Sequence, residues 1–252
     1  MRTLIAIPVF NEQKHLGRVL ELVLEQVSNG VRVLCIDDGS TDATPAILAN
    51  FPVDVVRHAR NRGYGRSMQD AFRWAQMDHC DWIVTMDCDE QHEPAAIPEF
   101  LALAAKNDAD VISGSRYLTL MNGDDSPPPD RRAINAELTR EINTRLGLGI
   151  TDAFCGFKAY SVRALDSLTF DVDGYAFPMQ FWVQAAAAKL RIKEHAIRLI
   201  YNDPKRTFGG PLNDATVRLS HYRCILHREL ARCASRLPPQ AVADIPAKLA
   251  CE

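Results

Sequence analysis

The sequence predicts an α/β protein with a mostly parallel sheet that helices cover on both faces. In the first half of the 252 residues, short apolar runs alternate with segments whose apolar residues recur at helical spacing. Polar or acidic residues follow each apolar run. Such alternation builds parallel sheets with helices on either side. The length, the 47% hydrophobic content and the lack of a Ser- or Gly-rich linker suit a single domain.

Strands and helices alternate from the N-terminus to about residue 115. The first predicted strand is the apolar run 4–7, which Pro8 ends, and a helix follows over 16–27. A β-rich run at 31–36 precedes Thr44-Pro45, a typical helix start. The pattern continues with strands at 53–56, 82–86 and 111–112 and helices at 65–77 and 94–106. This order predicts a Rossmann-like sheet.

After Tyr117 the alternation breaks. The Asp- and Pro-rich segment 124–130 is predicted to be a mobile loop or lid. Beyond it we expect helices at 131–146 and 178–189 and short strands at 157–160 and 192–199. The last predicted elements are an amphipathic helix over 214–236 and a flexible tail over 237–252. The amphipathic helix carries several arginines, so it either lies on a lipid surface or packs on its own domain.

Polar groups stand where five predicted strands end. Ligands of open α/β sheets bind beyond the carboxyl ends of the strands, so these groups predict a binding site. They are Asn11-Glu12, Asp37-Asp38, Arg60-Asn61-Arg62-Gly63, Asp87-Cys88-Asp89 and Ser115-Arg116.

Asp87 and Asp89 predict a divalent cation. Two close carboxylates repel each other unless a cation neutralises them, and oxygen ligands suit Mg²⁺ or Mn²⁺. Gln91 and His92 follow in the same turn as further candidate ligands. The alternative interpretation is a solvated acidic loop.

Two further motifs indicate a nucleotide. The Asp38 carboxylate can accept hydrogen bonds from the N–H groups of a nucleobase, although the same stretch also has the composition of a turn that caps the next helix. Gly63 and Gly65, within Asn61-Arg62-Gly63-Tyr64-Gly65, precede a helix and can bring backbone N–H groups against a phosphate. Gly-x-Gly also occurs at ordinary helix starts, so both interpretations stay open.

Composition argues against several other classes. With 29 Lys and Arg against 32 Asp and Glu, the formal charge of −3 gives no general attraction to nucleic acid. No signal peptide is evident, and no uncharged apolar run approaches the roughly 18 residues that indicate a membrane span. Seven scattered cysteines without a Cys-x-x-Cys pair are typical of reduced thiols. We expect a cytoplasmic protein with at most peripheral membrane contact.

Taken in order, these motifs resemble the inverting family 2 glycosyltransferases of the GT-A fold, and among them the dolichyl- or polyprenyl-phosphate mannosyl- and glucosyltransferases. The resemblance covers about residues 4–210. It rests on Ile7-Pro8-Val9-Phe10-Asn11-Glu12, Ile36-Asp37-Asp38-Gly39-Ser40-Thr41-Asp42, Asn61-Arg62-Gly63-Tyr64-Gly65, Met86-Asp87-Cys88-Asp89-Glu90-Gln91-His92 with Pro94, Gly114-Ser115-Arg116-Tyr117, Thr151-Asp152, Cys155-Gly156-Phe157-Lys158 and Phe177-Pro178-Met179.

The resemblance implies a role for each matching residue. Residues 1–117 would bind the nucleotide sugar, and 118–213 would face the acceptor. The implied residues are Pro8, Glu12 and Asp38 at the base, Asp87, Asp89 and Gln91 around the metal, Arg116 at a phosphate or the acceptor, the acidic Asp152, and Arg206 in a basic motif.

The expected reaction moves a hexosyl group from a GDP-mannose- or UDP-glucose-type donor to polyprenyl or dolichyl phosphate. Three departures leave the acceptor open: Gln180 stands where relatives often have Glu, Pro211-Leu212 replaces Ser-Lys, and no membrane helices follow. A soluble sugar or a protein hydroxyl, with Asp152 as general base, is the alternative acceptor. Two different functions also stay open, a nucleotidyltransferase and a noncatalytic nucleotide-sugar sensor. The Gly- and Lys-rich phosphate loop expected of a nucleotidyltransferase is missing near the first strand.

Overall fold

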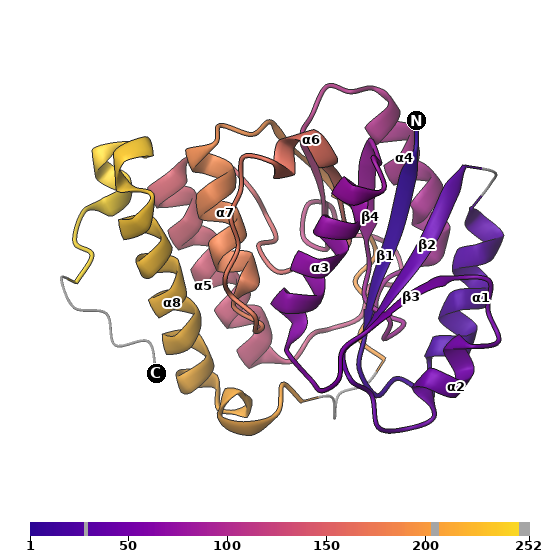
Figure 1. Cartoon of the computed structure of the whole chain (residues 1–252). Coiled ribbons are helices and arrows are strands. Elements are labelled where there is room, and N and C mark those ends of the chain that lie inside the picture. The colour runs from indigo at the N-terminus through magenta and orange to yellow at the C-terminus, as the bar shows by residue number, and fades with distance from the viewer. Residues whose placement is uncertain (28–29, 203–206, 247–252) are drawn as a thin grey trace.

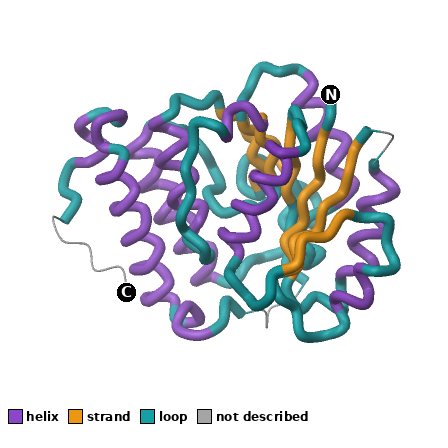
Figure 2. The backbone as a smooth tube through the Cα atoms, viewed as in Figure 1, coloured by secondary structure: helices purple, strands orange, loops and turns teal. Residues whose placement is uncertain are grey.

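The structure is a computed structural model that describes residues 1–27, 30–202 and 207–246 (Figure 1). Within these residues one sheet has seven strands in the order β3-β2-β1-β4-β6-β5-β7, and Figure 2 shows them gathered between helices. The strands are β1 Thr3–Val9, β2 Val31–Asp37, β3 Asp54–Arg57, β4 Trp82–Thr85, β5 Val111–Ser115, β6 Lys158–Ser161 and β7 Ile192–Ala196.

The first half of the chain has the predicted parallel pairing. β1 lies between β2 and β4 and is parallel to both, while β3 is parallel to β2. Val9 pairs with Asp37, and Ala6 pairs with Thr85, so these strands end at one edge of the sheet. The helices between them are α1 Leu16–Gln26, α2 Thr44–Leu48, α3 Tyr64–Met77 and, after the short 3₁₀ turn η1 Pro94–Ala96, α4 Ile97–Ala105.

Among the described strands, β6 alone runs antiparallel to its neighbours, a direction that the sequence does not predict. Lys158 pairs with Thr85 of β4, and Tyr160 pairs with Val111 of β5. The chain leaves the sheet at the carboxyl end of β5 and forms α5 Pro129–Leu146. It re-enters β6 at the end of β4 and therefore runs back through the sheet. Residues just before β6 thus lie beside the residues that follow β4.

The core forms one apolar layer on each face of the sheet. Along β1, Leu4 and Ala6 pack in one layer, and Ile5 and Ile7 pack in the other, as the two-residue repeat of a strand requires. The first layer includes side chains of α3, α5 and α7 Phe177–Ala187, and the second includes those of α1 and α4. Burial on both faces explains why the strand sequences are apolar runs.

The C-terminal helix packs on its own domain. It is observed as α8 Ala215–Arg232, followed by the turn η3 Ala234–Arg236, and Figure 1 shows it beside α5 and α7. Its apolar residues Tyr222, Leu226 and Leu230 are buried. Its arginines meet carboxylates of the same protein: Arg218 with Asp130, Arg223 with Glu137 and Glu141, and Arg228 and Arg232 with Asp171. These contacts favour the packed helix over a lipid-bound one.

The predicted flexible tail is wrong for residues 237–246. The 3₁₀ turn η4 Pro239–Val242 packs against α5, and Ala241 is fully buried. Arg145 of α5 donates hydrogen bonds to the carbonyl oxygens of Ala241 and Ala243, at 3.2 and 2.9 Å. Prolines at 238 and 239 stop a helix but do not prevent packing. The rest of the predicted tail, 247–252, lies outside the described residues.

Two observations bear on the predicted reduced thiols and on the predicted lack of a membrane span. Cys35, Cys80, Cys88, Cys155 and Cys233 are buried free thiols, as predicted. None of the helices in the described part of the chain is long and apolar enough to cross a membrane.

Candidate active site

A pocket of about 440 Å³ lies at the carboxyl edge of the sheet. Residues that follow β1, β2, β4 and β5 line it, together with residues from α5, α8 and the loops around α7. The parallel register brings these strand ends together, as predicted. The predicted site residues in its lining are Pro8, Glu12, Asp38, Gly63, Asp87, Asp89, Gln91 and Arg116.

The acidic turn after β4 is held by a neutral histidine. The backbone N–H of Asp87 donates to Nδ1 of His92 at 3.0 Å, so Nδ1 acts as an acceptor and Nε2 carries the proton. Burial lowers the pKa of His92 to about 4, which keeps the ring uncharged at neutral pH. In the same turn the N–H of Gln91 donates to Asp89 Oδ1 at 3.1 Å. The main contribution of His92 is therefore to orient the turn.

Gly156, two residues before β6, leaves room for the Asp87 carboxylate. A Cβ at position 156 would lie 2.5 Å from Oδ2 of Asp87. The antiparallel return of β6 creates this approach, because it brings residue 156 to the end of β4. Only glycine leaves the carboxylate where it is.

The donor set fits a cation that takes only part of its ligands from protein. In residues 1–27, 30–202 and 207–246, no three or more His, Cys, Asp and Glu side chains gather as a metal site. Asp87 and Asp89 line the same pocket, with 32% of the Asp87 side chain exposed. Mg²⁺ commonly binds through one or two carboxylates plus waters and substrate phosphate oxygens. Two carboxylates in an open pocket therefore suit a substrate-bridging cation better than a structural metal centre.

Asp38 shapes the loop beside it as well as lining the pocket. Its carboxylate is 2.6 Å from Nδ1 of His58 and accepts the backbone N–H groups of Arg62 and Gly63, each at 2.8 Å. These bonds use three of the roughly four acceptor sites of a carboxylate. The Gly63 N–H, predicted to face a phosphate, is therefore directed at Asp38, and about one acceptor site of Asp38 remains for a nucleobase.

Gly65 does not line the pocket. It is buried in the first turn of α3, and a Cβ there would collide with the carbonyl oxygen of Val172. Its small size serves the close packing of α3 against the chain near residue 172. The structure thus corrects the predicted role of Gly65 in binding the donor, since Gly-x-Gly here reflects packing.

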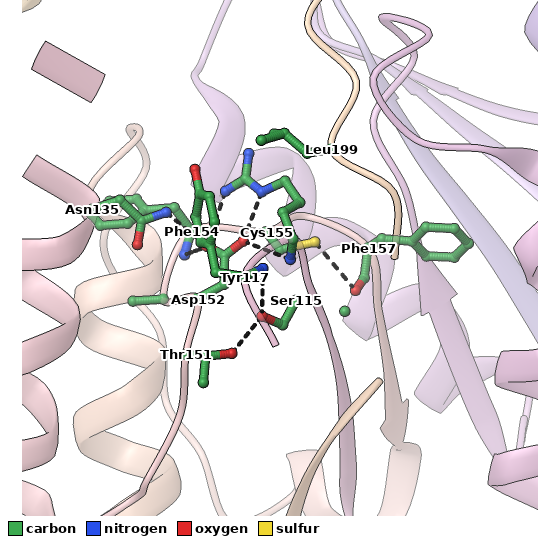
Figure 3. A network of polar contacts seen from close by, with 12 residues as sticks. Ser115, Tyr117, Asn135, Thr151, Asp152, Phe154, Cys155, Phe157 and Leu199 are labelled. Atoms are coloured by element: carbon green, nitrogen blue, oxygen red, sulfur yellow. Dashed lines mark hydrogen bonds and ion pairs between the residues drawn. The ribbon is translucent and has the colours of Figure 1, made fainter. Parts of the chain in front are cut away.

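Asp152 lies outside the lining of the pocket and holds the lining residue Arg116. Figure 3 shows the polar network around Asp152, with Asn135 and Thr151 nearby. Asp152 is fully buried and accepts hydrogen bonds from Arg116 Nε at 2.7 Å, Arg116 Nη2 at 2.9 Å and Asn135 Nδ2 at 2.8 Å. Burial alone would raise its pKa, but the Arg116 guanidinium holds the pKa well below the usual range. Asp152 is not among the pocket-lining residues. This placement argues against the predicted general base and for a positioning role.

Glu194 positions Asp152 in turn, although nothing in the sequence predicts it. Glu194, on β7, accepts the backbone N–H groups of Thr151 and Asp152 and the Thr151 hydroxyl, at 2.8–3.2 Å. Its single carboxylate in a short strand carries no local signal of this function. Arg206, which the resemblance places in a basic motif, lies outside the described residues.

The other end of the pocket is lined by arginines and aromatic rings. The guanidinium carbon of Arg131 lies 5.3 Å from the ring centre of Tyr201 and 4.7 Å from that of Phe208. Arg218 lies 4.6 Å from the Phe208 ring and pairs with Asp130 at 2.6 Å. Among the described lining residues beyond position 115 there is no carboxylate. The pocket is therefore acidic at the strand ends and basic at this end.

Fold and site together define the class of GT-A glycosyltransferases. A solved structure of glucosyl-3-phosphoglycerate synthase from Mycobacterium tuberculosis, in complex with Mn²⁺, UDP and phosphoglyceric acid, superposes with a TM-score of 0.69. The similarity covers 94% of this chain and 79% of that one at 18% identity. At that identity it establishes the fold.

The chain belongs to glycosyl transferase family 2, whose family model matches residues 4–169. It is 29% identical to the undecaprenyl-phosphate mannosyltransferase of Micrococcus luteus, over 88% of this chain and 94% of that one. It is 31% identical to the polyprenol monophosphomannose synthase of Mycolicibacterium smegmatis, over 70% of this chain and 69% of that one. The predicted resemblance is confirmed at the level of family and fold, and the protein is a glycosyltransferase.

Proposed function

We propose that this glycosyltransferase moves a hexosyl group, with inversion, from a nucleotide diphosphate sugar to a polyprenyl-type phosphate. The observation that carries the proposal is the polarity of the pocket, which Asp38, Asp87 and Asp89 line at the strand ends and Arg131 and Arg218 line at the other end. The names of the two relatives, which specify undecaprenyl phosphate and polyprenol, support the same class of acceptor.

On the donor side, Pro8, Glu12 and Asp38 line the part of the pocket where the base would bind. Asp87 and Asp89 would hold Mg²⁺ or Mn²⁺, and the presence of Mn²⁺ and UDP in the complex of the solved neighbour supports this assignment. A bound cation stabilises the negative charge that grows on the departing diphosphate. We assign residues 1–117 to this side and 118–213 to the acceptor side.

On the acceptor side, the lack of a described carboxylate favours a nucleophile that needs no base. A sugar hydroxyl must lose a proton as it attacks, whereas a phosphate oxygen is already anionic. Arg131, which lines this part of the pocket, and Arg116, which lines it at the end of the donor-side residues, would orient the phosphate through charge-assisted hydrogen bonds. Asp152 would act through Arg116 by fixing its guanidinium plane.

The test is a transfer assay with a panel of nucleotide sugars, each with Mg²⁺ or Mn²⁺. The acceptors are a short-chain polyprenyl phosphate, phosphoglyceric acid and a free sugar. We expect nucleoside diphosphate release and a glycosylated lipid only with the polyprenyl phosphate. Arg131→Gln should raise the acceptor KM more than it lowers kcat.

Three outcomes would contradict the proposal. Pyrophosphate release would indicate a nucleotidyltransferase. Donor binding without turnover on any acceptor would indicate a sensor. Efficient transfer to a hydroxyl that Asp152→Asn abolishes would restore Asp152 as a base.

A further inference from the structure

Three large apolar side chains stand exposed in the loop between β5 and α5. Leu118 is 43% exposed, Leu120 is 89% exposed and Met121 is 41% exposed. Scattered exposed leucines are ordinary on soluble proteins, but three exposed apolar residues within four positions form a patch. The patch directly follows Tyr117, which lines the pocket. It therefore lies next to the acceptor end of the site.

Polar contacts hold this loop in place, although the sequence predicts a mobile loop or lid. Asp124 accepts the N–H of Met121 at 2.7 Å and the N–H of Leu199 at 2.9 Å. Asp125 accepts the N–H of Tyr201 at 2.7 Å, and its own N–H donates to the Leu199 carbonyl oxygen at 2.8 Å. The two carboxylates thus tie the loop to the segment that follows β7. The apolar side chains are presented outward on a fixed turn.

Other exposed apolar side chains gather around the same opening. Phe10 and Tyr175, each 42% exposed, line the pocket themselves. Val217, 45% exposed, immediately precedes the pocket-lining Arg218. Most of the large apolar side chains exposed in the described part of the chain therefore lie at or next to this pocket; Met1, Val55 and Met77 complete the set.

We propose that residues 118–121 insert into the surface of a lipid bilayer and seat the mouth of the pocket on it. This inference rests on the proposed lipid-phosphate acceptor. The phosphate of such a lipid lies at headgroup depth while its chain stays in the hydrocarbon. A protein that buries apolar side chains just below the headgroups places nearby arginines at phosphate depth. α8 adds only Val217 to these exposed apolar side chains, because its arginines pair with carboxylates of the protein and Tyr222, Leu226 and Leu230 are buried in the core.

The experiment is flotation with neutral phosphatidylcholine vesicles that contain no acceptor, which isolates apolar insertion from charge attraction. The full chain should float. The double variant Leu118→Ser/Leu120→Ser should lower the fraction bound roughly tenfold or more. Leu120→Trp should retain binding, since Trp is favoured at the membrane interface. Met77→Ser is the matched control, because Met77 is 81% exposed at the end of α3, and it should float like the wild type.

Four outcomes would overturn the inference. In the first, the double variant floats like the wild type. In the second, the double variant and Met77→Ser lose vesicle binding equally. In the third and fourth, the wild type floats only with anionic vesicles, or only when polyprenyl phosphate is present. The last would assign the patch to the acceptor's own chain instead of the bilayer.

Transfer to a water-soluble, short-chain polyprenyl phosphate separates this inference from the proposed function. The double variant should retain this activity, because neither leucine lines the pocket. Loss of flotation with activity retained supports the inference. A wild type that floats but transfers to no lipid phosphate would refute the proposed function and leave the membrane contact standing.

Discussion

Replacing Asp152 with Asn removes the charge that compensates Arg116 while keeping the shape of the side chain. The amide retains one acceptor oxygen, but its NH₂ group would face a guanidinium donor at a position that is fully buried. Breaking a buried ion pair typically costs about 3–5 kcal/mol. The Arg116 side chain is 17% exposed, so water relieves part of this cost, and we expect about 3 kcal/mol. For a chain of this size that lowers Tm by roughly 6–12 °C.

The pH dependence gives this prediction its sharper test. The pKa of Asp152 is depressed in the folded state, so its stabilising contribution is complete above the unfolded pKa of about 4 and is lost as pH falls further. In urea unfolding, the gap between wild type and Asp152→Asn should be constant from about pH 5 to 7 and shrink below about pH 4. Asp108→Asn, at an exposed pair with Lys193, is the matched control and should leave the urea midpoint unchanged. Equal midpoints at neutral pH, or a gap that ignores pH, would refute the reasoning.

Three further predictions concern the donor side and the C-terminal packing. Asp89→Asn should lower kcat about 10²–10³-fold in the transfer assay, with an unchanged circular dichroism spectrum. Gly156→Ala should displace the Asp87 carboxylate and raise the cation concentration for half-maximal activity about tenfold, while Gly17→Ala should not. Burial opposes the charge of Glu141, but its imidazole and guanidinium partners lower its pKa to about 2. Glu141→Gln should therefore lower the free energy of unfolding by about 2 kcal/mol above about pH 5, and by progressively less below that pH.

Each of these has an outcome that contradicts it. Near-normal turnover of Asp89→Asn, with chelation of divalent cations also harmless, would remove the carboxylate from the mechanism. Unchanged cation dependence in Gly156→Ala would show that residue 156 does not set the position of Asp87. If the difference in free energy of unfolding between the wild type and Glu141→Gln stays constant from acid to neutral pH, the ionised form of Glu141 does not stabilise the α5–α8 contact.

The elements that the sequence predicts best are those with a strong local signal. β1 and β2 are buried on both faces, and their continuous apolar runs predict this burial. The direction of β6 has no such signal, because four residues contain nothing that distinguishes a parallel from an antiparallel strand. Its direction follows from where α5 returns the chain to the sheet.

The same distinction between local and distant signals applies to the residues of the candidate site. Asp38, Asp87 and Asp89 could be predicted because parallel strands bring their ends to one edge. The burial of Asp152 could not, since it depends on a partner 36 positions away in the sequence. The prediction for Gly65 is wrong because the same Gly-x-Gly pattern is found in phosphate-binding loops and at closely packed helix starts, and Gly65 belongs to the second kind.

The place of β6 in the sheet also bears on how such a chain can diversify. Because β6 lies between β4 and β5, the part of the sequence that follows β5 is woven into the same sheet as the part that precedes it. It cannot be exchanged as a module without unpairing central strands. A changed lining at the arginine-rich end of the pocket would therefore have to arise by substitution in the loops and in α5 and α8, with the strand pairing left intact.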